Sequence, residues 1–77
     1  MDAAAFIGPV YESPGPEGKG DPTKLLYWYG DLQGDDPVRS LGEFQGTKDE
    51  AIAWAKESDA TLRFIYDEEL QDFVALQ

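Results

Sequence analysis

The stretch LLYWYG is a run of five large apolar or aromatic residues, and it predicts a strand whose two faces are both largely apolar. Successive side chains of a strand point to opposite faces, so Tyr27 and Tyr29 share one face. Leu26 and Trp28 share the other, and we predict that this second face packs against the core. The next stretch, GDLQGDDP, holds two glycines, a proline and three aspartates, which is typical of a turn. The pattern therefore predicts a hairpin that returns as a strand over residues 38–44.

A helix is predicted over GTKDEAIAWAKES. Thr47 is followed three residues later by Glu50, which is the spacing of a capping box that satisfies two backbone donors at a helix start. At about 100° per residue the apolar side chains occupy one broad arc. These are Ala51, Ile52, Trp54 and Ala55. The small Ala residues at the centre of this arc predict a helix that lies close against a sheet.

A third strand is predicted over TLRFIY, which alternates and is rich in β-branched and aromatic residues. The tail DEELQDFVALQ fits two patterns. Leu70, Phe73 and Val74 fit a helical stripe behind an acidic first turn. By contrast, the alternation expected of the partner strand of a hairpin is met by Leu70, Asp72, Val74 and Leu76. We favour the strand and keep the helix as the alternative.

The N-terminal part of the chain is predicted to be an arm. Its stretch GPVYESPGPEGKGDP contains four prolines and four glycines, a density that disfavours both helix and central strand. The apolar residues 3–7, with Val10 and Tyr11, fit either an edge strand docked on the domain or a mobile tail. We therefore expect an arm over residues 1–22 and one α+β domain over residues 23–77. The domain would be a small antiparallel β-β-α-β-β sheet with one helix on one face.

The composition of the chain excludes several classes of function. The 77 residues carry a formal net charge of -10, with sixteen acidic and six basic residues, so the chain should repel nucleic acids and anionic lipids. There is no Cys and no His, which excludes disulfides, thiolate chemistry and the usual zinc sites. The N-terminus does not resemble a signal peptide, and no apolar run reaches the roughly 18 residues needed to span a bilayer. We expect a cytoplasmic protein.

Carboxylates are the only groups abundant enough for catalysis, and they fall in predicted turns where solvent keeps them ionised. We therefore expect no enzyme, no catalytic residues and no cofactor. A Ca²⁺ site in the turn at residues 31–36 is a remote alternative, because the loop has acids and glycines without the EF-hand spacing. Our prediction is that there is no specific metal site.

The chain resembles a family of short uncharacterised domains in bacteria and their phages. The resemblance covers about residues 25–76 and rests on a Trp-bearing strand followed by the helix pattern T-x-x-E-A-I-x-x-A. The matching residues are Trp28, Thr47, Glu50, Ala51, Ile52 and Ala55. It implies a β-β-α-β-β domain and no activity. The acidic balance departs from that family, as do residues 67–69, where its members often have a Gly.

Two function classes remain. The leading hypothesis is a small acidic interaction or regulatory module that binds a basic surface of a partner protein, one form of which is a nucleic-acid-mimicking inhibitor. Aromatic anchors and acidic charges would then contact the partner. The candidates are Tyr27, Tyr29, Asp35, Asp36, Asp67, Glu68, Glu69 and Asp72. The alternatives are a self-associating homodimer without a ligand, and a domain whose acidity serves only solubility or salt adaptation.

Overall fold

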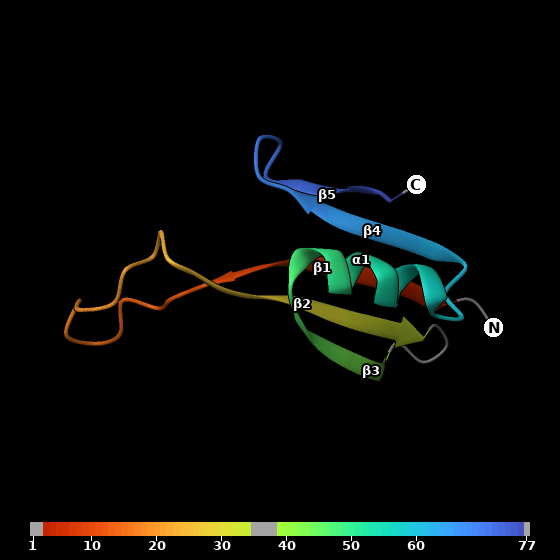
Figure 1. Ribbon diagram of the computed structural model, residues 1–77, viewed down its shortest axis with the longest axis horizontal. Helices are drawn as coiled ribbons and strands as arrows, with labels where there is room; N and C mark the ends of the chain where they lie inside the picture. Colours follow the sequence, from red (N-terminus) through yellow and green to blue (C-terminus); the bar gives the residue numbers. More distant parts are fainter. Residues whose placement is uncertain (1–2, 35–38, 77) are drawn as a thin grey trace.

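The computed structural model describes residues 3–34 and 39–76. Within them one helix packs on a five-stranded sheet (Figure 1). The elements are β1 (Ala3–Tyr11), β2 (Leu25–Gly34), β3 (Arg39–Gly46), α1 (Lys48–Glu57), β4 (Leu62–Asp67) and β5 (Asp72–Ala75). The strand order is β3-β2-β1-β4-β5. The predicted α+β class with one helix is confirmed, whereas the strand count and strand order differ from the prediction.

The main difference lies at the N-terminus, where neither an edge strand nor a tail is found. Residues 3–11 form β1, the central strand, which is antiparallel to β2 and parallel to β4. The predicted arm thus contributes the middle of the sheet. Gly8 and Pro9 resemble a loop in the sequence, but β1 pairs with β4 only over residues 4–7. Beyond residue 7 there is no β4 partner to which β1 must donate. Pro9, which has no N–H, therefore does not interrupt the β1–β4 ladder.

The Pro- and Gly-rich segment is the tip of the long β1–β2 hairpin and extends away from the sheet, at the left of Figure 1. The Glu12 N–H donates to the Lys24 carbonyl at 2.9 Å and closes its neck. A Cβ atom at Gly20 would lie 1.8 Å from the Ser13 carbonyl oxygen, so this close backbone approach requires glycine. Residues 12–24 are neither helix nor strand, so the prediction for residues 8–22 holds beyond Tyr11 and is wrong for residues 8–11, which belong to β1.

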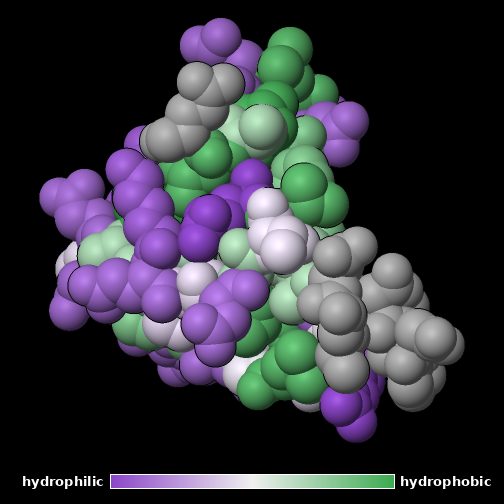
Figure 2. Space-filling view, turned by 90° about the vertical axis from the view of Figure 1, so that its right-hand side faces the viewer, coloured by the Kyte–Doolittle hydropathy of each residue, from purple (hydrophilic) through white to green (hydrophobic). Residues whose placement is uncertain are grey.

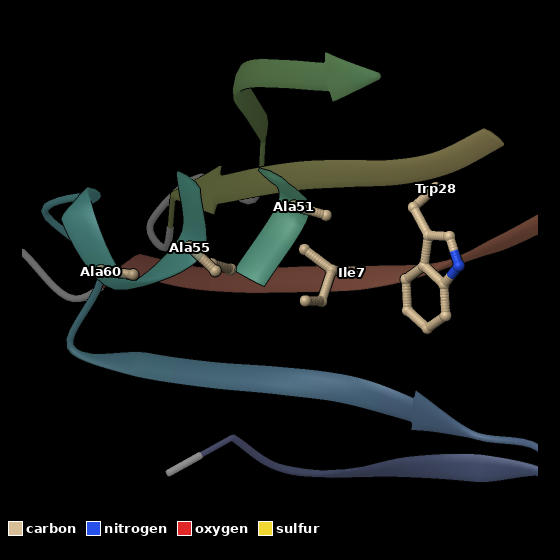
Figure 3. Packing of buried hydrophobic residues seen from close by; sticks show 6 residues of the cluster. Ile7, Trp28, Ala51, Ala55 and Ala60 are labelled. Carbon is tan, nitrogen blue, oxygen red and sulfur yellow. The ribbon is translucent and has the colours of Figure 1, made fainter. Parts of the chain in front are cut away.

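The core lies between α1 and the sheet, and small residues bring the two layers together. Ala51 and Ala55 of α1 are fully buried, as is Ile7 of β1 (Figure 3). Trp28 closes one end of this cluster with 7% of its surface exposed, which confirms its predicted burial. Leu26 was predicted to lie beside it but is 50% exposed. The helix does not extend over the part of β2 that enters the projecting hairpin, so nothing covers this leucine.

Both ends of α1 are held by side chains. The predicted capping box is present: Glu50 N donates to Thr47 Oγ1 at 3.2 Å, and Thr47 N donates to Glu50 Oε1 at 3.0 Å. At the C-terminal end Arg63 of β4 donates to the carbonyls of Ala55 (2.7 Å) and Ser58 (3.2 Å). Its positive charge complements the negative end of the helix dipole. One arginine thus fastens the helix to β4.

The turns of the chain differ from the prediction at one place and agree with it at another. Asp31, predicted to begin a turn, lies within β2, and the remainder of that turn, with Asp35 and Asp36, falls outside the described residues. The favoured strand for the tail is confirmed as β5, which pairs with β4 through a turn where Gln71 has a φ of 53°.

Among the described residues, no helix is long and apolar enough to cross a membrane.

Candidate functional site: an aromatic groove on the open face

The sheet has one face covered by α1 and one face, here called the open face, that carries no helix (Figure 1). Strand alternation and register place a defined set of side chains on it. They are Ala4, Phe6, Gly8 and Val10 of β1; Tyr27, Tyr29, Asp31 and Gln33 of β2; Ser40, Glu43 and Gln45 of β3; Leu62, Phe64 and Tyr66 of β4; and Phe73 and Ala75 of β5. In Figure 2 hydrophilic residues gather at the left, the side of α1, and hydrophobic residues extend to the top, near β4 and β5.

An open groove of about 500 Å³ lies on this face. Its floor is residues 6–9 of β1, its first wall is formed by Tyr29, Asp31 and Gln33 of β2, and its second wall is formed by Tyr66 and Phe73. The groove exists because β1 has no side chain at Gly8, between bulky residues on both neighbouring strands. This size and a lining of apolar and aromatic residues with a few polar groups are typical of ligand sites.

The second wall is held by ring contacts. Phe6 stacks on Phe64 with centroids 5.2 Å apart and meets Phe73 edge-on at 5.4 Å. Phe73 in turn meets Tyr66 edge-on at 5.4 Å. Such pairs stabilise by about 0.5–1.5 kcal/mol beyond the burial of area. The aromatic wall is therefore preorganised, which lowers the entropy lost when something binds against it.

Two carboxylates stand beside the groove without a cation. Asp31 lies directly opposite Glu43 in the β2–β3 register, and it accepts hydrogen bonds from Gln33 Nε2 (2.8 Å) and Ser40 Oγ (2.9 Å). Both donors are neutral. No Lys or Arg occurs among the open-face residues named above, and within the described part of the chain the one ion pair found lies in the hairpin tip. Among the residues that the structure describes, the negative charge at this edge of the groove is therefore uncompensated.

The nearby negative charge affects the ionisation of Tyr29. Partial burial raises the pKa of its phenol above the ordinary value, and the nearby carboxylates of Glu43 and Asp31 raise it further. The folded state then holds the phenolic proton more tightly than the unfolded state does. Stability from this group is fully present below a pH of about 10 and is lost as the pH rises through the higher folded-state value.

We therefore expect alkaline pH to destabilise the protein, and Tyr29→Phe to reduce that loss. Urea unfolding at a series of pH values, together with the tyrosinate absorbance of folded and urea-unfolded protein, measures both effects. A variant that loses stability with the same slope as the parent above a pH of about 10 would contradict the assignment.

The predicted acidic residues of the tail gather at the β4–β5 turn. Asp67 and Asp72 are directly opposite each other, and the Asp67 carboxylate accepts from the backbone N–H groups of Glu69 and Leu70, so it shapes the turn. Glu68 accepts a hydrogen bond from the Tyr11 hydroxyl at 2.5 Å, which links the turn to the neck of the hairpin. This bond is the main reason that the pKa of Tyr11 is raised.

The acidic turn borders a second hollow, on the helix side of the sheet. This hollow measures about 420 Å³, and its lining includes Trp28 and Lys48 together with residues 65–69. The Lys48 ammonium lies 5.5 Å from the centre of the Trp28 ring, which is a cation–π contact. Of the predicted contact residues, Tyr29 thus lines the groove on the open face. Asp67, Glu68 and Glu69 line the second hollow instead. Tyr27 lies further along β2 on the open face, and Asp35 and Asp36 lie outside the described residues.

Several residues in or beside the groove were not identified from the sequence. Phe6 and Gly8 were assigned to an arm, Asp31 to a turn, and Glu43 was not singled out. Alternation across FIGPVY would have placed Phe6 and Gly8 on one face had this segment been recognised as a strand. The pairing of Asp31 with Glu43 could not be found in this way, because it depends on the register between two strands.

The groove offers aromatic surfaces, backbone and carboxylate oxygens. Among the described residues no group of three or more side chains of the kinds that ligate metals comes together. Comparisons of the chain with protein-family models, curated proteins and solved structures find no match. The function must therefore be inferred from the groove itself.

Proposed function

We propose that the open face is a docking surface for a positively charged segment of a partner protein. The observation that carries this proposal is the aromatic groove beside the uncompensated carboxylates of Asp31 and Glu43. Aromatic rings attract cations through their faces, and the carboxylates supply charge-assisted hydrogen bonds. A segment with basic side chains complements both features.

The charge of the whole protein supports the same kind of partner. A formal net charge of -10 accelerates encounter with a basic surface, an attraction that weakens when salt screens it. The acidic residues of the β4–β5 turn add to this long-range field. They are Asp67, Glu68, Glu69 and Asp72. A nucleic-acid-mimicking inhibitor would use the charge alone, whereas the aromatic groove favours recognition of particular side chains on the partner.

The test uses a fluorescent peptide of repeating Gly-Lys-Gly-Arg and measures its anisotropy as the protein is added. We expect saturable binding at low salt that weakens several-fold at an ionic strength of about 0.15 M. The double variant Asp31→Asn with Glu43→Gln should bind several-fold more weakly. An equally charged acidic peptide of Gly and Glu should show no binding.

The matched control removes the same charge elsewhere. Glu57→Gln with Asp59→Asn also neutralises two of the sixteen acidic residues, at exposed positions near the end of α1. This control should retain most of the affinity, because only long-range attraction is reduced. If both double variants weaken binding equally, net charge alone attracts the peptide and the groove is not the docking surface.

Self-association is the second candidate, and apolar surface favours it. On the open face Leu62 and Phe73 are 55% and 43% exposed. A symmetric dimer through this face would also bring the Asp31 and Glu43 carboxylates of two copies together, which disfavours it. Sedimentation at micromolar concentration distinguishes the two candidates. A monomer is expected for the docking surface, and a stable dimer that Phe73→Ser disrupts would support self-association instead.

A further inference from the structure

We infer that the groove recognises an arginine side chain, whose guanidinium lies over Gly8 between Tyr29 and Tyr66 and bonds to the Asp31 carboxylate. This inference rests on the proposed function and identifies the anchor residue of the basic segment. It follows from the spacing of the strands that form the groove, the remaining acceptor sites of the carboxylate and the planarity of the guanidinium.

The width comes from one row of residues that crosses the sheet. Gly8 is directly opposite Tyr29 on β2, and Tyr66 on β4 is directly opposite Phe73 on β5. A Cβ atom at Gly8 would lie 3.1 Å from Tyr66 Cβ, so Tyr66 flanks the glycine on its other side. The backbones of β2 and β4 are two strand spacings apart, or about 10 Å. A flat group stacked between two rings needs about 7 Å, which is less than this backbone separation.

The Asp31 carboxylate retains acceptor sites for a bidentate contact. Gln33 binds its Oδ2 and Ser40 binds its Oδ1, so each oxygen has one neutral donor. A carboxylate has about four acceptor sites, which leaves one on each oxygen. Two parallel N–H groups of a guanidinium match such a pair of sites, whereas an ammonium makes a point contact.

Aromatic walls also favour arginine over lysine. The guanidinium is flat, stacks on aromatic rings and is more weakly hydrated than an ammonium, so it loses less on leaving water. A lysine could reach the same carboxylate but would leave the two phenol faces poorly covered. The groove should therefore discriminate between two side chains of equal charge.

The experiment is an amide-resolved NMR titration of the full chain with N-acetyl-arginine amide and, separately, N-acetyl-lysine amide. We expect arginine to shift the amide signals of Gly8, Tyr29 and Tyr66, and to reach half-saturation at about a tenfold lower concentration than lysine. Asp31→Asn keeps the shape of the side chain but replaces one acceptor oxygen with an NH2 donor, so it should weaken arginine binding several-fold. Gly8→Val should fill the slot and abolish the shifts, and the same spectra report whether this variant is folded.

The outcomes separate this inference from the proposed function. Equal half-saturation by the two compounds at these amides would overturn the arginine preference while leaving a basic docking surface in place. Shifts confined to amides outside the groove would overturn the assignment of the site. If the basic peptide described above also fails to bind, the docking function itself is wrong. Unchanged arginine binding by Asp31→Asn would exclude the bidentate contact, even if Gly8→Val does not fold.

Discussion

Gly30→Ala is expected to destabilise the protein by about 1–3 kcal/mol, although it adds only one methyl group. Gly30 lies on β2 beneath α1, where the ring of Trp54 covers it. A Cβ atom there would lie 2.5 Å from Trp54 Cζ3 and 2.8 Å from Cε3, distances that no packed pair of carbons sustains. Trp54 is also held by Phe44, the register partner of Gly30 on β3, whose ring stacks on it with centroids 5.7 Å apart. The helix would therefore have to shift.

Gly42→Ala is the matched control, because it makes the same change on the neighbouring strand. A Cβ atom at Gly42 has no heavy atom within 4 Å. Alanine there should be neutral or stabilise by up to about 1 kcal/mol, since it restricts the unfolded chain. Urea unfolding followed by tryptophan fluorescence and circular dichroism measures both variants. Equal stability of the two would show that Trp54 does not pack over β2 at Gly30.

Ile7→Ala is expected to cost about 2–5 kcal/mol, because it empties the centre of a small core. The side chain of Ile7 on β1 is fully buried and belongs to the same cluster as Ala51 and Ala55 of α1 (Figure 3). A domain of this size has a total stability on the order of 5 kcal/mol, so most of it would be lost. Thermal and urea unfolding should both show the change.

Leu26→Ala removes a similar volume from an apolar residue that sequence alone assigned to the core. Because Leu26 is 50% exposed on the hairpin, we expect a change within about 0.5 kcal/mol. The two variants together distinguish a central strand at residues 3–11 from a mobile tail. If residues 3–11 were a tail, Ile7→Ala would be neutral and Leu26→Ala would be costly, which is the reverse of the expected result.

Local patterns explain which elements could be predicted. The helix is encoded by Thr47 and Glu50 at its start and by small residues on one side, all within a few turns of each other. Strands β2 and β4 were found because alternating aromatic and aliphatic residues need no knowledge of their neighbours. Strand β1 was missed because Gly8 and Pro9 are common in loops. Only its pairing with two other strands shows that a glycine and a proline fit there.

The site was predictable to the same limited degree. Alternation alone placed Tyr27 and Tyr29 on the face away from the helix. Alternation could not show that Gly8 would separate Tyr29 from Tyr66, since these residues come from three strands far apart in the sequence. It also misplaced Asp31, because a stretch rich in Gly and Asp resembles a turn even where the strand continues.

The sequence by itself determined the α+β class, the capped helix, the alternation of the aromatic strands and the strongly negative charge. These properties depend on neighbouring residues or on composition. Tertiary structure alone decided that β1 is central, that the Pro- and Gly-rich segment is a projecting hairpin tip, and that two tyrosines and an aspartate border one groove. The physical reason is that strand order and register arise from pairing between distant segments, and a one-residue change in register reverses the face of every side chain.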